Sequence, residues 1–235
     1  MTESYATPQS SAIQNLFSNI ASKYDLLNFL LSFGLDRMWR NAAVRKSLRE
    51  TDKSILDVGT GSGKLLKAYC SRHSFNRAVG IDFCEPLLEK AKRDFVGSPE
   101  VSFRKINLIE MDLGDEKFDI ISASFVLRSV ADDLSNFFGN VHSALHPNGR
   151  FVILELTRPR NLIFNFLFQP YLKCYLPLLG KLISGNWTAY QFLAQSILHF
   201  KEREEVVGLL KGVGFSRVDS KLLTSGIATL FVAQR

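Results

Sequence analysis

The 235-residue sequence lacks the features that define several large classes of protein. Its only cysteines, Cys70, Cys84 and Cys174, are far apart and have no CxxC spacing, so neither a disulfide framework nor a metal site is predicted. No run of 18 or more apolar residues occurs, because polar residues and a proline at 169–173 interrupt the most hydrophobic segment. We therefore expect a protein of a reducing compartment without a transmembrane helix.

Long runs of one charge are also missing. The net charge of +6 and the pI of about 9.3 suit an anionic partner or a membrane surface, but the basic residues are scattered and show no cluster interleaved with aromatic residues. Residues 1–12 contain Glu3 but no arginine and fit neither a signal peptide nor a transit peptide. We expect a cytoplasmic protein that binds no nucleic acid, with surface charges that are mainly solvated.

Strand and helix patterns alternate through the middle of the chain, and 46% hydrophobic with 22% charged residues is ordinary for one globular domain over residues 1–235. Strands are predicted at 55–58, 78–82, 101–106, 118–126 and 150–156, and helices at 64–71, 86–95, 132–145 and 202–213. This alternation predicts a parallel sheet with right-handed crossovers. The turn at 146–149 is expected to separate the third of these helices from the strand at 150–156.

The two ends of the pattern differ from its middle. Residues 217–223 and 227–233 are joined by a Thr-Ser-Gly turn, which predicts an antiparallel hairpin. Two regions lie outside the alternating core, an N-terminal segment within residues 1–50 that is helical from residue 13, and an insertion at 158–200 rich in Phe, Leu and Tyr. Because ligands bind at the carboxyl ends of parallel strands, both regions are expected to cover that edge and select the substrate.

The most informative stretch is residues 55–63, Ile-Leu-Asp-Val-Gly-Thr-Gly-Ser-Gly, a buried strand that runs into a glycine turn. Such a turn exposes backbone N–H groups at a helix N-terminus, where a nucleotide ligand can approach closely. Its glycines alternate strictly, unlike the G-x-G-x-x-G/A pattern of dinucleotide folds. Asp82 ends the next strand and can accept both hydroxyls of a ribose. A plain strand-to-helix connection and a solvated Asp82 are the alternatives.

This combination of GxGxG turn and acidic strand end resembles the S-adenosylmethionine site of class I methyltransferases. The resemblance implies a Rossmann-like, mostly parallel seven-stranded sheet with a C-terminal antiparallel hairpin. Residues 17–28 and 31–40 further resemble the opening of the ubiquinone/menaquinone biosynthesis C-methyltransferase family. The match continues through residues 125–130, 146–150, 154–159, 178–185 and 223–227.

The resemblance implies methyl transfer from S-adenosylmethionine to a ring carbon of a polyprenylated quinol, without a metal. The family's cofactor contacts fall on Gly59, Gly61, Ser62, Asp82, Asn107, Leu108 and Ser124. Asp82 would bind the ribose, and Asn107 with Leu108 the adenine. A turn residue with no ligand is the alternative for Asn107.

Arg128 is the first candidate catalytic residue, because a fixed cation can stabilise the phenolate that forms when the quinol loses a proton. A structural salt bridge is the alternative. Weaker candidates are Tyr24, Asp25, Tyr190 and His199, each of which can also be a capping or core residue.

Several residues depart from the family's pattern. Lys64 stands where the family has an acidic residue, Val126 and Ser129 replace a glycine and an asparagine, and Ser62 replaces a threonine but keeps the hydroxyl. These departures keep open the alternative of a protein that binds the cofactor without catalysis. Methylation of another small molecule or of RNA is a second alternative, because such enzymes share the cofactor half of the fold. The head group, the tail length and a homodimeric state are left open.

The insertion has a further implication for the site of action. Its aromatic and leucine residues would line a route for the isoprenoid tail, and structural packing is the equal alternative. Lys173 and Lys181 near the apolar face favour loose peripheral attachment to the anionic inner face of the cell membrane.

Overall fold

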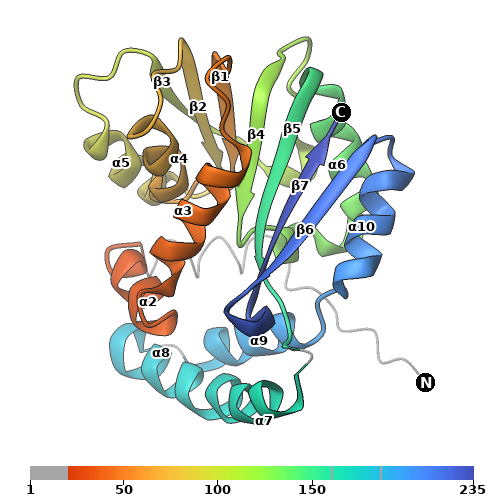
Figure 1. Cartoon of the computed structure of the whole chain (residues 1–235). Helices are drawn as coiled ribbons and strands as arrows, with labels where there is room; N and C mark the ends of the chain where they lie inside the picture. Colours follow the sequence, from red (N-terminus) through yellow and green to blue (C-terminus); the bar gives the residue numbers. More distant parts are fainter. Residues whose placement is uncertain (1–20, 160, 186) are drawn as a thin grey trace.

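The computed structural model describes residues 21–159, 161–185 and 187–235, and its sheet has the strand order β3-β2-β1-β4-β5-β7-β6. The strands are β1 (Ser54–Val58), β2 (Arg77–Asp82), β3 (Val101–Lys105), β4 (Phe118–Ser124), β5 (Leu145–Leu156), β6 (Arg217–Leu223) and β7 (Ala228–Gln234). Strands β1 to β5 pair in parallel, and β7 lies antiparallel between β5 and β6. The expected seven-stranded sheet with its antiparallel hairpin is confirmed (Figure 1).

Helices cover both faces of this sheet because successive strand residues point to opposite sides. The helices between strands are α4 (Lys64–Cys70), α5 (Glu85–Asp94), α6 (Leu134–Ser143) and α10 (Arg203–Gly212), and α3 (Leu35–Ser47) precedes β1. Ile55 of β1 belongs to an apolar cluster with residues of α3 and α4. Its neighbour Leu56 belongs to a second cluster with residues of α6 and α10. The two faces therefore have separate hydrophobic cores.

Most predicted boundaries differ from the structure by one or two residues, and those of β4 and β5 are wrong for identifiable local reasons. Strand β4 ends at Ser124 and not at residue 126, because Phe125 adopts a positive φ of 60° that leaves the extended conformation. Strand β5 begins at Leu145, so the turn at 146–149 lies within the strand. Leu145 pairs with Phe118, and a register shift follows before the regular pairing resumes at Arg150. The irregular segment thus remains attached to β4.

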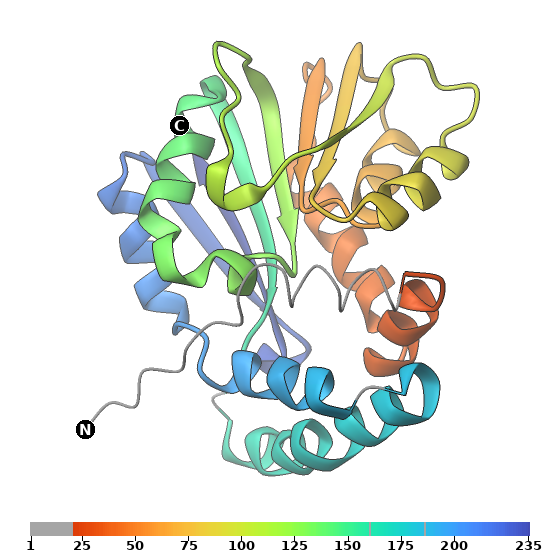
Figure 2. The same cartoon turned by 180° about the vertical axis from the view of Figure 1, so that it is seen from behind.

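The remaining helices form a layer beyond the carboxyl ends of the parallel strands (Figures 1 and 2). They are α2 (Tyr24–Leu31), α7 (Leu162–Pro170), the π-helical turn η3 (Tyr171–Tyr175), α8 (Leu176–Ser184) and α9 (Trp187–Leu198). Leu27 of α2 packs with Phe168, Leu172 and Tyr190 of the insertion. The N-terminal segment and the insertion therefore share one apolar cluster over the edge where a ligand is expected. The part of the N-terminal prediction at 1–20 lies outside the described residues.

Pro170 ends α7 and precedes the π-helical turn. A proline lacks the N–H that continues a helical hydrogen-bond ladder, so the change of helix type at this position has a local cause. Among the residues that the structure describes, no helix combines the length and the apolar character needed to cross a bilayer.

Candidate active site

The glycine turn lies between β1 and α4, against the segment that follows β4. A Cβ atom added to Gly59 would collide with Val126 and would come within 3.5 Å of Leu108 Cδ1. Gly59 also has a φ of 65°, which a residue with a side chain rarely adopts. The turn therefore needs a glycine here for two independent reasons, and its backbone is held close to the ends of neighbouring strands.

Asp82 at the end of β2 is 6% exposed and directly braces this turn. Its Oδ2 accepts a 2.8 Å hydrogen bond from the N–H of Gly61, and its Oδ1 accepts a 2.9 Å bond from the N–H of Cys84. Burial raises the pKa of Asp82, although these backbone N–H groups act in the opposite direction. A carboxylate has about four acceptor sites, so Asp82 keeps acceptor capacity for a hydrogen bond from a ligand hydroxyl beside its backbone N–H bonds.

Asp57, near the end of β1, is a buried carboxyl. It belongs to the glycine motif, but it was not among the site residues predicted from the sequence. Its oxygens accept hydrogen bonds from Thr60 Oγ1 at 2.7 Å and Ser122 Oγ at 2.6 Å. Burial raises the pKa of Asp57 to about 6, and the hydrogen bonds from Ser122 and Thr60 limit the rise. The acid before the glycines therefore joins the turn to β4.

Helix α2 is tied to the glycine turn by a cluster of charges. Ser62 Oγ donates a 2.5 Å hydrogen bond to Asp25 Oδ1, and Lys90 and Lys64 place their ammonium groups 2.9 Å and 3.5 Å from Asp25 Oδ2. Burial alone would raise the pKa of Asp25, but the bonds from Ser62 and Lys90 and the Lys64 charge outweigh it and lower the pKa. Lys64 also pairs with Asp94 at 3.2 Å. The positive charge at position 64, where the family has an acidic residue, is therefore paired with the carboxylates of Asp25 and Asp94.

An apolar cavity of about 230 Å³ lies between α2, α3, the insertion and the residues that follow β4. Its lining includes Leu27, Trp39, Phe125, Phe168, Tyr171 and Ile197. Tyr24 also lines the cavity, and its ring would lie 3.4 Å from a Cβ atom added to Gly61. The cavity thus adjoins the glycine turn, with Tyr24 between them.

Arg128 lies on the wall of this cavity, in the short helix η2 (Leu127–Asp133). Its Nη1 forms an ion pair with Oε1 of Glu155, which is fully buried and also accepts N–H bonds from Leu127 and Leu156, each at 2.9 Å. Burial raises the pKa of Glu155, and the Arg128 charge opposes that rise. The structural salt bridge that was the alternative for Arg128 is therefore present. This ion pair holds the guanidinium at the cavity wall beside Ser129.

The other predicted site residues are also near the carboxyl edge. Asn107 accepts a 3.3 Å bond from the N–H of Ile109, and Leu108 is buried facing Gly59. Ser124 is the half-buried last residue of β4.

Two of the weaker candidates separate in the structure. Tyr190 lines the apolar cavity, whereas His199 is exposed beyond the end of α9 and does not line it.

The sheet order, the glycine turn and the acidic end of β2 define a class I methyltransferase that uses S-adenosylmethionine. The chain belongs to the ubiE/COQ5 methyltransferase family, whose model matches residues 5–235. The resemblance expected from the sequence is thereby confirmed, as are the class of enzyme and its methyl donor.

Named relatives support this assignment. The chain is 38% identical to a demethylmenaquinone methyltransferase of Thermus thermophilus over 221 residues, which cover 94% of this chain and all of the relative. It is 34% identical to the ubiquinone/menaquinone biosynthesis C-methyltransferase UbiE of Geotalea daltonii, over 97% of this chain and 98% of the relative.

Solved structures show the same fold at low sequence identity. Human N-acetylserotonin methyltransferase in complex with S-adenosylmethionine is 15% identical, with a TM-score of 0.66 over 99% of this chain and 61% of the other. A methyltransferase of Mesorhizobium loti is 19% identical, with a TM-score of 0.59 over 83% and 96%.

Proposed function

We propose that this protein methylates a ring carbon of a polyprenylated quinol, converting demethylmenaquinol to menaquinol, carrying out the benzoquinol step of ubiquinone synthesis, or both. The observation that carries the proposal is the position of Tyr24, which lies against Gly61 on one side and lines the apolar cavity on the other. A cofactor at the glycine turn and an apolar substrate in the cavity would therefore be neighbours. The names of relatives at 34–38% identity support a quinol substrate.

The residues at the turn fit S-adenosylmethionine. Asp82 would accept hydrogen bonds from the ribose hydroxyls, and Asn107 and Leu108 would hold the adenine. Ser124 would offer a hydroxyl, and Ser62, whose proton is donated to Asp25, would offer an acceptor oxygen. Gly59 and Gly61 both have a positive φ, so the turn keeps a backbone conformation that residues with side chains rarely adopt. The bound cofactor supplies a methyl group already activated by a positively charged sulfur, so the protein's task is alignment.

The Asp82 assignment has a direct test. Asp82→Ala is expected to weaken S-adenosylmethionine binding at least about 100-fold, because two hydrogen bonds to a carboxylate are lost. Titration calorimetry measures the affinity, and thermal melting checks that the variant is folded. The matched control is Asp112→Ala, which removes an exposed carboxylate far from the turn in sequence. Unchanged affinity in Asp82→Ala would remove the ribose assignment.

Arg128 would act on the substrate and not on the cofactor. A quinol carbon becomes nucleophilic when the adjacent hydroxyl loses its proton, and a fixed cation lowers the free energy of the resulting phenolate. Arginine stays charged in proteins, so Arg128 would stabilise this anion directly or through a bound water. Glu155 would orient the guanidinium, since its carboxylate is itself fixed by two backbone N–H groups.

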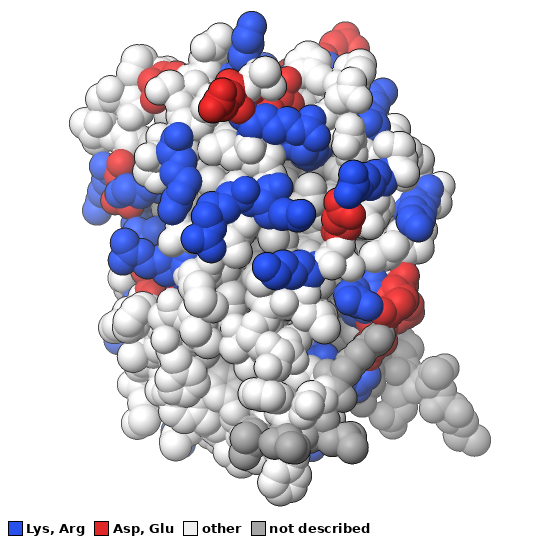
Figure 3. Space-filling view, viewed as in Figure 1, with Lys and Arg blue, Asp and Glu red and all other residues white. Residues whose placement is uncertain are grey.

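The substrate's tail would pass along the helical layer towards a membrane. Exposed apolar side chains are found on this layer, among them Phe29 at 56%, Phe166 at 76% and Leu182 at 76% exposure. Figure 3 shows that the part of the surface formed by these helices is largely uncharged, in contrast to the rest of the same face. Lys173 of η3 and Lys181 of α8 are exposed on the same layer, and such cations favour loose attachment to an anionic leaflet.

Vesicle sedimentation tests the membrane contact. The protein is expected to pellet with vesicles that contain phosphatidylglycerol, and the double variant Phe166→Ser, Leu182→Ser is expected to pellet less. Val96→Ser is the control, because Val96 is 85% exposed but follows α5. Equal pelleting of all three proteins, or none with anionic lipid, would contradict the proposed surface.

A further inference from the structure

A second cavity of about 230 Å³ lies near the end of α3, over the part of the sheet formed by β5, β7 and β6. Its lining includes the cations Lys46, Arg49, Arg150 and Arg217, together with Asp219. None of these residues lines the apolar cavity. The volume is far above the ~10–15 Å³ that a single water needs, so the cavity can hold a small polar ligand.

The sheet register brings two of these cations together. Arg150 of β5 pairs with Gln234 of β7, and Gln234 pairs in turn with Arg217 of β6. Directly paired residues of antiparallel strands point to the same face. The two guanidinium groups therefore flank Gln234 on the face that the end of α3 also approaches.

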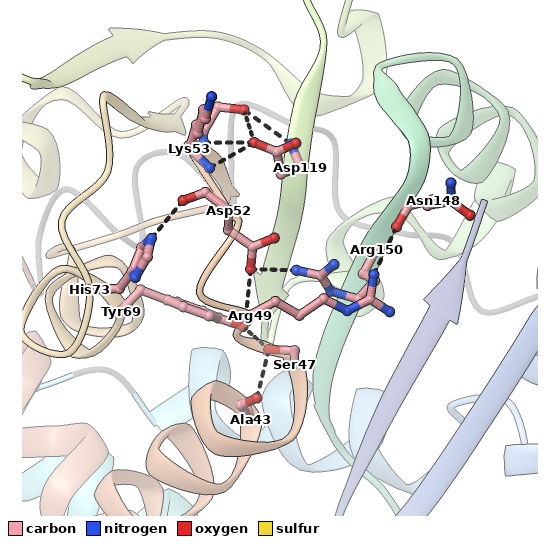
Figure 4. A network of polar contacts seen from close by, with 11 residues as sticks. Ala43, Ser47, Arg49, Asp52, Lys53, Tyr69, His73, Asp119, Asn148 and Arg150 are labelled. Atoms are coloured by element: carbon pink, nitrogen blue, oxygen red, sulfur yellow. Dashed lines mark hydrogen bonds and ion pairs between the residues drawn. The ribbon is translucent and has the colours of Figure 1, made fainter.

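Arg150 is the buried base of the cavity, with 4% of its surface exposed. Its Nη2 donates a 2.5 Å hydrogen bond to Asp52 Oδ2, while its Nε has no hydrogen-bond partner in the part of the chain that the structure describes. The same Asp52 oxygen accepts the N–H of Arg49 at 2.7 Å. Figure 4 shows the Arg150 side chain extending from β5 towards Asp52, and the Arg49 side chain extending from beside Asp52 towards β5. Asp52 thus anchors the guanidinium of Arg150 and the backbone of Arg49, whose own guanidinium donates a 3.4 Å bond to the carbonyl oxygen of Asn148. Neither guanidinium uses all of its donors in these contacts.

The charges around this cavity do not balance. The described lining carries four cations and one carboxylate, Asp219, which is 3.1 Å from Arg217, while Asp52 beside the cavity pairs with Arg150. Lys46 is exposed and forms no ion pair with any residue in the described ranges. Figure 3 shows the wider setting, with lysine and arginine side chains gathered on the part of this face over α3 and β6. Cations held this close repel one another, and a bound dianion would relieve that repulsion.

We propose that this cavity binds the phosphate group of a small soluble molecule, inorganic phosphate included. Guanidinium groups donate paired N–H bonds that match phosphate oxygens, and Lys46 adds a mobile point charge. A phosphate on a lipid headgroup is the less suitable source, because the exposed apolar side chains of α7 and α8 lie at the other end of the sheet (Figure 1). The site is separate from the methyl-transfer site and does not depend on it.

Titration of the full-length protein with inorganic phosphate, at ionic strength held constant with chloride, tests this site. Saturable binding is expected, with affinity about tenfold lower in Lys46→Gln and in Arg217→Gln, since each loses a charged contact. Both changed side chains are exposed, so the folded protein should be retained. Lys211→Gln on α10 is the control, because α10 packs on the opposite face of the sheet. No saturable binding, or equal affinity in all four proteins, would overturn the proposal.

A second arm distinguishes the source of the phosphate. Pelleting with vesicles that contain phosphatidic acid is expected to be the same for the wild-type protein, Lys46→Gln and Arg217→Gln. If both variants lose pelleting while soluble phosphate does not bind the wild-type protein, the ligand is a lipid headgroup and the proposal of a soluble phosphate is wrong.

Discussion

Asp25 and Ser62 are 37 residues apart in the sequence, and the Ser62 hydroxyl donates a 2.5 Å hydrogen bond to the Asp25 carboxylate. This contact fixes α2 on the glycine turn, next to Tyr24. Because Tyr24 also lines the apolar cavity, the same contact sets the position of one wall of the proposed substrate site.

Loss of this contact should lower the rate of reaction with the substrate more than it lowers the stability of the fold. Asp25→Ala is expected to lower kcat/KM for the quinol by about 100-fold, since a displacement of about 1 Å at a reacting site costs that much. Asp94→Ala is the control, because it removes the other carboxylate of Lys64 without touching α2. Steady-state kinetics at saturating S-adenosylmethionine distinguish the two. Similar kcat/KM values for both variants would show that α2 does not position the substrate.

Arg128 should matter for turnover and, separately, for stability. Arg128→Lys keeps a cation opposite Glu155 but loses the planar guanidinium, so cofactor affinity should be retained while kcat falls at least about tenfold. Arg128→Ala leaves a buried carboxylate without its partner and should lower the free energy of unfolding by about 3–5 kcal/mol. The exposed Arg158, which pairs with Glu202 at 2.5 Å, provides the control Arg158→Lys. Normal turnover in Arg128→Lys would exclude the catalytic assignment.

The raised pKa of Asp57 predicts a pH dependence of stability. In the folded protein the carboxyl keeps its proton up to about pH 6, whereas the unfolded chain releases it near 3.8. Asp57 therefore contributes stability below pH 3.8, and that contribution, about 3 kcal/mol, is lost as pH rises to about 6.

Asp57→Asn removes this titration while retaining a polar side chain. Denaturant unfolding between pH 4 and pH 7 should therefore show the wild-type protein losing stability relative to the variant as pH rises. A difference that stays constant over this range would mean that burial does not perturb Asp57.

Gly180 and Tyr190 provide a packing test within the insertion. A Cβ atom added to Gly180 would overlap the Tyr190 ring, whereas one added to Gly208 meets nothing within 4 Å. Gly180→Ala should lower the free energy of unfolding by about 1–3 kcal/mol and raise the KM for the quinol, since Tyr190 lines the cavity. Gly208→Ala, also in a helix, should stabilise by about 0.5–1 kcal/mol. Equal effects of the two changes on stability and KM would contradict this packing.

Features that depend on residues close together in the sequence are predicted well. The buried strand, the glycine turn and Asp82 are adjacent elements of one pattern, and the structure brings them together as expected. The ion pair of Arg128 with Glu155 joins segments 27 residues apart, and no spacing rule specifies such a contact in advance. The end of β4 is a similar case, because the apolar run continues through residue 126 whereas Phe125 has a positive φ and its ring contacts Trp39 of α3.

The candidate residues of the helical layer show the same limit. Tyr190 and His199 both carry a side chain that can transfer a proton, so the sequence does not distinguish between them. In the structure Tyr190 lines the cavity and His199 does not. The packing of α9 on α8 determines which side of the helix is buried. Apolar residues at helical spacing are found both in the core and on the surface of this insertion, so the sequence pattern alone cannot assign the lining.

The most direct test of the account is methyl transfer from labelled S-adenosylmethionine to reduced demethylmenaquinone and, in parallel, to the demethylated benzoquinol precursor of ubiquinone, with mass spectrometry of the lipid product. We expect the label on a ring carbon of one or both quinols, and the more active substrate identifies the head group. Bound S-adenosylmethionine without any methylated quinol would contradict quinol methylation and favour another acceptor, such as RNA, or a cofactor-binding protein without catalysis.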